Sequence, residues 1–403
     1  MTLLLDLANG GRLMHNNRKQ FFVLALAFLM SMFFRSYFGV VGPMVAADID
    51  LDPSRYGYAA SAFFISFGLL QMPLGSAFDR FGAGTPMTVL MIVGAMGAAL
   101  VAMARTAGQL VAGQAVLGAG CAPIFMGVVY QFGSLGDGVA ARRKITAVSA
   151  VGTIGALLSA SPMVWLSEVL GWRGAMLVAA SAMALCAVGV AFQMAPTPQE
   201  GQSEEATESR PAGLVYLLPI CLTLSLGGTF RNAWATPYLS GVFSADQRVS
   251  GFALTIVSAV GIGTSFAIPA LVSKVSPRSI VTAGMVAATI AAFAMAVSPG
   301  SSIVAAVALI CLLYSIGNLH PLVMAEAQEL APSKHRGLLL GFLNTLVFFG
   351  VAISSAVFGW IAQSAGGPSA TFEIILFSTA GCLAIGLTAY LARPAWRSIA
   401  NQR

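Results

Sequence analysis

The sequence has little charge for its length. Only 9 % of its 403 residues are charged, and 57 % are hydrophobic, whereas about 25 % of the residues of a typical soluble domain are charged. A soluble protein of this size could not cover its surface with so few charges, so most of the surface must face lipid. The net charge of +6 therefore does not indicate nucleic-acid binding. We interpret it as the basic excess that membrane proteins keep on their cytoplasmic side.

Cysteine and histidine are also scarce. The five cysteines lie inside apolar runs without the spacing of metal ligands, and the three histidines are scattered. This pattern indicates neither a disulfide framework nor a zinc site. No nucleophile–base set and no selectivity-filter repeat is recognisable, so we expect neither an enzyme nor a channel, and no cofactor or metal. We also expect no signal peptide, because no cleavage site follows the first apolar run.

Long apolar runs make up most of the chain. A membrane-spanning helix needs about 20 apolar residues, and the sequence offers twelve candidates. They are residues 21–44, 56–77, 86–104, 108–130, 146–167, 174–194, 214–239, 251–272, 280–297, 302–325, 338–362 and 371–392. The polar stretch 195–213 has the composition of a flexible linker. We predict an all-α membrane protein with twelve transmembrane helices, divided into six-helix halves at 1–194 and 214–403.

The basic residues predict the orientation of these helices. An even number of spans places both termini on one side. Fifteen of the 21 Lys and Arg residues fall on that side, two lie within spans, and the opposite side has only four: Arg55, Arg105, Arg173 and Arg248. By the positive-inside rule both termini are cytoplasmic. We expect a multi-pass protein of the bacterial inner (plasma) membrane.

The two halves show signs of an internal repeat. Phe34-Arg35 in span 1 matches Phe230-Arg231 in span 7 at an offset of 196 residues, and Pro73 matches Pro269 at the same offset. Together with the equal number of spans, these matches favour a duplicated six-helix unit. Parallel repeats of this kind place the substrate site at the membrane midplane, between the halves.

A short loop after span 2 carries the most specific motif. Its residues are Gly75, Asp79, Arg80 and Gly82. Their spacing, with the twelve spans, resembles the major facilitator superfamily over essentially the whole chain. Where that family adds basic residues after the second glycine, this chain has Ala83 and Gly84. The resemblance implies alternating access, a monomer, and a loop that serves as a conformational latch.

The arginines in spans 1 and 7 narrow the resemblance. An arginine midway along each of these spans is similar to the organophosphate:phosphate exchangers of the superfamily. A span-1 arginine also occurs in its organic-anion symporters, usually beside an acidic residue, where this chain has Phe34. The resemblance implies a small anionic substrate held by Arg35 and Arg231 from opposite halves.

Physical chemistry favours the same interpretation. Arg35 lies roughly 21 Å into a hydrocarbon core of about 30 Å, and Arg231 lies at an equivalent depth. A central arginine costs about 2.5–3.5 kcal/mol on insertion scales, and guanidinium suits carboxylate or phosphate. All acidic residues fall in loops or near span ends, so an anionic substrate would supply the missing counter-charge. The alternative is a structural arginine bonded to backbone carbonyls.

Other residues complete the candidate site. His320 precedes Pro321, and we interpret it as a proton relay, as a third substrate ligand, or as a neutral histidine that bonds a carbonyl freed by the kink. Glu326 is a second proton-coupling candidate. Further candidates for the substrate pocket are Tyr37, Phe38, Trp234, Tyr238 and Asn344. The remaining polar residues within spans are expected to make helix–helix hydrogen bonds: Gln114, Tyr130, Asn232, Tyr314 and Asn318.

The sequence thus predicts a secondary transporter for a small organic or inorganic anion. We expect exchange as the first mechanism, because unpaired arginines would hinder reorientation of the empty carrier, and proton symport as the second. Two alternatives remain. One is a proton-coupled exporter of drugs or metabolites, against which the missing central carboxylate counts. The other is an anion sensor of the same fold that does not transport.

Overall fold

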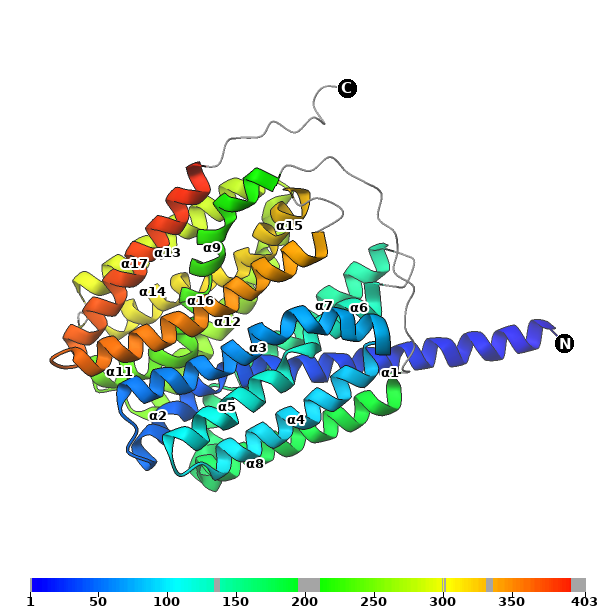
Figure 1. Cartoon of the computed structure of the whole chain (residues 1–403), viewed down its shortest axis with the longest axis horizontal. Coiled ribbons are helices and arrows are strands. Elements are labelled where there is room, and N and C mark those ends of the chain that lie inside the picture. Colours follow the sequence, from blue (N-terminus) through cyan, green and yellow to red (C-terminus); the bar gives the residue numbers. More distant parts are fainter. Residues whose placement is uncertain are drawn as a thin grey trace.

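The structure of the chain is a computed structural model that describes residues 2–133, 138–194, 211–298, 300, 302–330 and 336–392. These residues form helices joined by short connections (Figure 1). The predicted all-α class is confirmed. Most of the predicted linker, residues 195–210, lies outside the described residues.

In the described residues eight helices precede the linker, and we call them the N-terminal half. They are α1 (Thr2–Ser36), α2 (Phe38–Asp48), α3 (Pro53–Phe81), α4 (Gly84–Met103), α5 (Ala107–Cys121), α6 (Pro123–Gly133), α7 (Gly138–Leu158) and α8 (Ser161–Gln193).

The helices after the linker form the C-terminal half, which lies beside the first in Figure 1. They are η1 (Pro211–Leu217), α9 (Leu218–Thr223), α10 (Leu226–Thr229), η2 (Phe230–Trp234), α11 (Ala235–Phe243), α12 (Gln247–Val272), α13 (Pro277–Val297), α14 (Ile303–Ser315), η3 (Ile316–Leu319), α15 (His320–Leu330), α16 (Arg336–Ser364) and α17 (Pro368–Ala392).

Eleven helical stretches of the described residues are long and apolar enough to cross a membrane. The twelfth predicted span, 146–167, is divided between α7 and the start of α8. The reversal into the next span occurs within α8 at Gly171, whose φ of 69° is left-handed. Glycine adopts this conformation without the steric cost that a Cβ imposes. With this divided span counted beside the eleven longer stretches, the described residues contain the predicted twelve spans, and the turn at Gly171 separates the fifth from the sixth.

Besides the divided fifth span, four spans of the described residues are interrupted near their middle. The interruptions lie at Tyr37 between α1 and α2, at Ala122 between α5 and α6, at the short π-helix η2, and at the 3-10 segment η3. These are spans 1, 4, 7 and 10, which occupy corresponding places in the two halves. Discontinuous helices leave backbone groups free near the midplane, where transporters form their substrate sites.

The halves meet closely on one side of the bundle. We call the end where α8 stops at Gln193 and η1 starts at Pro211 the linker side, and the opposite end the far side. Cross-half hydrogen bonds toward the far side join Tyr56 Oη to Ala233 O (2.5 Å), Ser61 Oγ to Ala352 O (2.6 Å) and Gln247 Nε2 to Val40 O (2.9 Å). An exposed ion pair joins Arg248 to Glu168 at 2.7 Å.

Glycine permits this close approach of the halves. A Cβ on Gly57 of α3 would lie 2.5 Å from Ser355 O of α16, which is far inside van der Waals contact. The same holds within the N-terminal half, where a Cβ on Gly120 would lie 2.1 Å from Gly94 Cα. Small residues at such crossings are typical of helix packing in membranes.

Candidate functional site

Arg35 is the next-to-last residue of α1, beside the interruption at Tyr37. Its Cζ lies 4.4 Å from the ring centroid of Phe67 and 5.3 Å from that of Phe348. These rings come from α3 and α16, one from each half, and their centroids are 4.5 Å apart. Arg35 thus lies where the two halves meet, and the rings attract its charge through their electron-rich faces.

The guanidinium of Arg35 has few partners. Its hydrogen bond in the described part of the chain is a 3.9 Å contact from Nη1 to Met32 Sδ. Its Nε is buried without any hydrogen-bond partner there. Thioether sulfur is a weak acceptor, and a guanidinium offers five N–H donors. The half-buried side chain therefore keeps most of its donor capacity available.

Arg231 has the same buried Nε without a partner among the described residues, but its Nη atoms differ from those of Arg35. It lies in η2, it is 0 % exposed, and it is bonded on both Nη atoms. Nη1 donates to Ser36 O (3.3 Å) and Asn232 Oδ1 (3.1 Å), and Nη2 donates to Ala156 O (3.0 Å) and Ser258 Oγ (2.6 Å). These bonds match the alternative of an arginine bonded to backbone carbonyls.

Two of these acceptors are backbone carbonyls of the N-terminal half, and each lies at the C-terminal end of a helix. Ser36 is the last residue of α1, and Ala156 lies in the last turn of α7. Carbonyls at helix C-termini lack intrahelical partners, and the helix dipole makes that end negative. Arg231 therefore stabilises two helix ends of the opposite half, which explains how a buried cation persists there without a carboxylate.

His320 and Tyr314 lie near the two arginines. The Cζ of Arg231 is 5.8 Å from the ring centroid of Tyr314, and Tyr314 is close enough to interact electrostatically with Arg35 as well. His320 lies within electrostatic reach of Arg35, and its Nε2 is buried without a hydrogen-bond partner among the described residues. The structure thus groups Arg35, Arg231, Tyr314 and His320 in the middle of the bundle.

The predicted aromatic residues pack elsewhere. Tyr37 is buried and donates its hydroxyl to Gln114 Oε1 at 2.9 Å, inside the N-terminal half. Phe38 and Trp234 both contact the Tyr56 ring, with centroids 5.0 Å and 5.3 Å from it, at the closed far side. Tyr238 packs on Phe372 at 5.2 Å. We assign these four side chains to helix packing in this conformation.

The last two predicted residues differ in their surroundings. Asn344 of α16 is half-buried, and the structure records no partner for its amide in the described residues. Glu326 lies farther along α15, toward the linker side, and accepts a 2.9 Å hydrogen bond from Tyr390 Oη. Asn344 therefore remains a candidate for the central site, whereas Glu326 belongs to a separate contact between α15 and α17.

The predicted latch connects α3 to α4 on the linker side. Gly82 ends α3 with a left-handed φ of 69°, and its amide donates to Phe78 O. Asp79 and Arg80 are exposed, and Arg80 Cζ lies 5.1 Å from the Phe81 ring centroid. Gly75 has open space around it.

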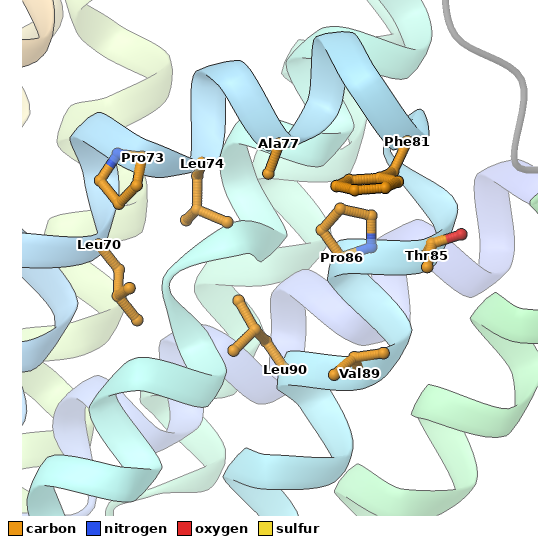
Figure 2. A pocket seen from close by; sticks show the side chains of 9 residues that line it. All are labelled: Leu70, Pro73, Leu74, Ala77, Phe81, Thr85, Pro86, Val89 and Leu90. Carbon is orange, nitrogen blue, oxygen red and sulfur yellow. The ribbon is translucent and has the colours of Figure 1, made fainter.

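A shallow hollow of about 350 Å³ lies beside this loop, between α3 and α4 (Figure 2). Its lining side chains are apolar apart from Thr85, and Figure 2 shows Phe81 and Pro86 facing each other across it. It opens on the outside of the bundle and includes none of the central polar residues. In the described residues, no group of three or more His, Cys, Asp or Glu side chains is placed to hold a metal ion.

Three residues at the centre do not belong to the predicted substrate site: Tyr314 of the central group, and the two rings beside Arg35, Phe67 and Phe348. Tyr314 was noticed as a polar residue within a span but was assigned to a helix–helix hydrogen bond. Its place just before the Gly317-Asn318 interruption is the signal that favours a site role. Phe67 and Phe348 carry no such signal, because they are ordinary apolar residues in sequence and meet only through the packing of α3 on α16.

A family model places the chain among known proteins. The model described as Major Facilitator Superfamily matches residues 24–355 and, in a second match, residues 221–403. The chain belongs to the major facilitator superfamily. This membership confirms the resemblance carried by the loop after span 2 and by the twelve spans. No curated protein matches the sequence.

Solved structures of superfamily transporters share the fold. A mutant of the nucleoside transporter NupG superposes with a TM-score of 0.75 at 13 % identity, covering 94 % of this chain and all (100 %) of that one. A bacterial homologue of the human lysosomal transporter Spinster, inward-facing and occupied, gives 0.73 at 15 % identity, covering 92 % and 95 %. The D-xylose–proton symporter gives 0.70 at 13 %, covering 91 % and 96 %. At these identities the likeness concerns the fold alone. The chain is a multi-pass membrane protein of a transporter superfamily.

Proposed function

We propose that this superfamily member carries a small anion across the membrane by alternating access, and that Arg35 binds the anion. The observation that carries the proposal is the state of the Arg35 guanidinium, which is buried at Nε without a partner and otherwise bonded only to a thioether in the described residues. A cation desolvated in the middle of a membrane protein is costly unless a counter-charge compensates it. None of the ion pairs between described residues includes Arg35, so the anion is the compensating charge.

We propose that the two arginines serve the anion in turn. Arg35 is available in the present conformation, in which the far side is closed. Arg231 is held by Ser36 O and Ala156 O of the other half, and it loses both acceptors when the far side opens. An anion entering from that side then replaces them. The earlier expectation of a simultaneous clamp becomes a succession of contacts, one on each side of the membrane.

We propose exchange as the coupling mode, with proton symport as the alternative. Reorientation without a bound anion leaves an arginine unpaired during the change, whereas reorientation with an anion does not. For symport, His320 is the proton site we favour, because its buried Nε2 has no hydrogen-bond partner among the described residues. Glu326 is the weaker candidate, since it is bonded to Tyr390 away from the central group.

We further propose the setting in which the protein works. The basic residues of the loops orient the linker side toward the cytoplasm of a bacterium, so that the closed far side faces away from the cytoplasm, and the protein functions as a monomer in the inner membrane. In this setting the loop with Asp79 and Arg80 acts as a latch at the cytoplasmic ends of α3 and α4.

The proposal is tested directly by measuring whether small anions from a panel bind to the purified protein. The panel contains phosphate, phosphate esters, monocarboxylates and dicarboxylates, with cations and neutral sugars as comparisons. A ligand that binds only the native state raises stability by about 2.7 kcal/mol at a hundred times its Kd, which thermal unfolding detects. The variants are Arg35→Ala and Arg35→Lys, and the matched control is Arg105→Ala, which removes an exposed arginine at the far side.

We expect one anion class to stabilise the wild type and Arg105→Ala, and not Arg35→Ala. Arg35→Lys retains the charge but loses the planar fork, so it binds the same class more weakly. In proteoliposomes, uptake that requires an internal counter-anion supports exchange, and uptake driven by a pH gradient alone supports symport. Stabilisation by cations or neutral compounds in wild type and Arg35→Ala alike contradicts the proposal and favours the export alternative.

A further inference from the structure

Tyr314 is held in a fixed place between the two arginines. Its ring packs against α12, where a Cβ on Gly261 would lie 2.6 Å from its Cε1. Its backbone packs against α10, where a Cβ on Gly227 would lie 2.0 Å from Leu313 O. Two glycines thus bring the phenol close to Arg231, whose Cζ lies 5.8 Å from the ring centroid, and within electrostatic range of Arg35.

The Tyr314 hydroxyl differs from those of the other tyrosines buried nearby. Tyr37 donates to Gln114, and Tyr56 donates to a backbone carbonyl. For Tyr314 the structure records no hydrogen-bond partner within the described part of the chain, and its side chain is half-buried in the central group. A phenol hydroxyl can both donate and accept a hydrogen bond. The two cations near Tyr314 favour an orientation in which its oxygen faces them, or one in which its hydroxyl and the guanidiniums bind the same anion.

We infer that Tyr314 is a substrate ligand, whose hydroxyl donates a hydrogen bond to the anion that Arg35 holds. This inference rests on the proposed function and names the chemistry of the substrate further. The planar fork of Arg35 matches a group with two or more oxygens, and Tyr314 adds a donor from the other half. The substrate is therefore an oxyanion, a carboxylate or a phosphate ester, that presents oxygens to both halves at once.

The same contact gives the anion a role in bringing the halves together. Arg35 belongs to α1 and Tyr314 to α14, so an oxyanion bound by both bridges the N-terminal and C-terminal halves in the middle of the bundle. A ligand that touches only one half would bind without favouring either conformation. Tyr314 thus couples binding to closure.

The test compares Tyr314→Phe with Tyr58→Phe, which removes a hydroxyl from an exposed position on α3. Transport of the anion identified by the panel is measured in proteoliposomes. A hydrogen bond to a charged group corresponds to about tenfold to hundredfold in affinity, so we expect KM for Tyr314→Phe to rise by at least about tenfold, with kcat within about threefold of wild type. Tyr58→Phe is expected to behave as wild type.

A second pair of variants separates the hydroxyl from folding. Gly261→Ala keeps the Tyr314 hydroxyl and displaces the ring, whereas Gly263→Ala on the same helix adds a Cβ with no atom within 4 Å. We expect Gly261→Ala to raise KM as Tyr314→Phe does, the double variant to be no worse than either single one, and Gly263→Ala to be neutral. Thermal unfolding without ligand shows whether each variant is folded.

The outcomes distinguish this inference from the proposed function. If Tyr314→Phe keeps wild-type KM while Arg35→Ala loses the anion, the inference is wrong and the proposed function stands. The same holds if Tyr314→Phe lowers kcat and leaves KM unchanged, because the residue then acts only on the conformational step. If Arg35→Ala and Tyr314→Phe both bind the anion as wild type does, the proposed function and the inference fail together.

Discussion

Arg231 is predicted to hold the far side of the transporter closed. Its Nη atoms bond Ser36 O and Ala156 O, which are carbonyls at the C-terminal ends of α1 and α7 in the other half. Opening the far side must break both bonds, because Arg231 moves with the C-terminal half. The perturbation that tests this is Arg231→Leu, which removes the donors and the charge but keeps an apolar side chain in the interface.

The size of the effect follows from the number of bonds. A hydrogen bond to a charged group contributes about 1.5–3 kcal/mol net, so the loss of two removes roughly 3–6 kcal/mol that favours far-side closure. Because about 1.4 kcal/mol is a factor of ten, the ratio of closed to open molecules falls by roughly 10² to 10⁴. Arg231→Lys keeps the charge near both helix ends with less reach, and we expect an intermediate shift.

Distances between spin labels measure this ratio. Labels at Arg105→Cys and Ser364→Cys mark exposed far-side positions in the two halves, in a background without native cysteines. We expect one short distance in the otherwise unchanged protein and an added longer distance with Arg231→Leu.

The matched control is Asn232→Ala, which removes a partner of Arg231 from its own half and leaves both cross-half bonds. It is expected to keep the short distance. An unchanged distance distribution in a folded Arg231→Leu variant would refute the reasoning, because the bonds would then not decide which side is closed.

Three further predictions concern the interface between the halves. Gly57→Ala places a Cβ against Ser355 O, and a backbone atom cannot move aside as a flexible side chain can. We therefore expect α3 and α16 to separate and the transport rate in proteoliposomes to fall by more than about tenfold. Tyr56→Phe removes one neutral cross-half hydrogen bond and is expected to shift the closed-to-open ratio by about fivefold, less than Arg231→Leu in the same spin-label assay. Glu168→Gln breaks the exposed ion pair with Arg248, and we expect transport within about twofold of wild type, with no dependence on salt beyond that of the wild type, because exposed pairs contribute little.

Charge and hydropathy by themselves determined the class of this protein. With 9 % charged residues and long apolar runs, the chain can keep its apolar surface away from water only as a bundle of helices in a membrane. The number of twelve spans followed from the length that a helix needs to cross the hydrocarbon core. The loop with Asp79 and Arg80 pointed to the superfamily, because its motif of glycines around an Asp-Arg pair is local in sequence. The two arginines were found for the same reason: a charge in the middle of an apolar span is conspicuous without any tertiary information.

Only the tertiary structure could tell the two arginines apart. Arg35 and Arg231 occupy equivalent places in a repeat, so sequence treats them alike. Their difference arises from which half-to-half contacts are formed: Arg231 meets the carbonyl ends of α1 and α7, while Arg35 meets two phenylalanine rings. These contacts join residues 32 to 313 positions apart, and no local pattern encodes them.

The same limit applies to the surroundings of Trp234, Tyr238 and Tyr314. Helical spacing put Trp234 and Tyr238 on the face of Arg231, but the π-helix at η2 changes the residues per turn and sends them into far-side packing. Tyr314 reached the centre through two glycines on neighbouring helices, whose effect depends on how closely those helices approach. The periodicity of the sequence determines which residues share a face of a regular helix. Which neighbouring side chains that face contacts depends on helix interruptions and on close contacts at glycines, and both are decided by the packing of the helices.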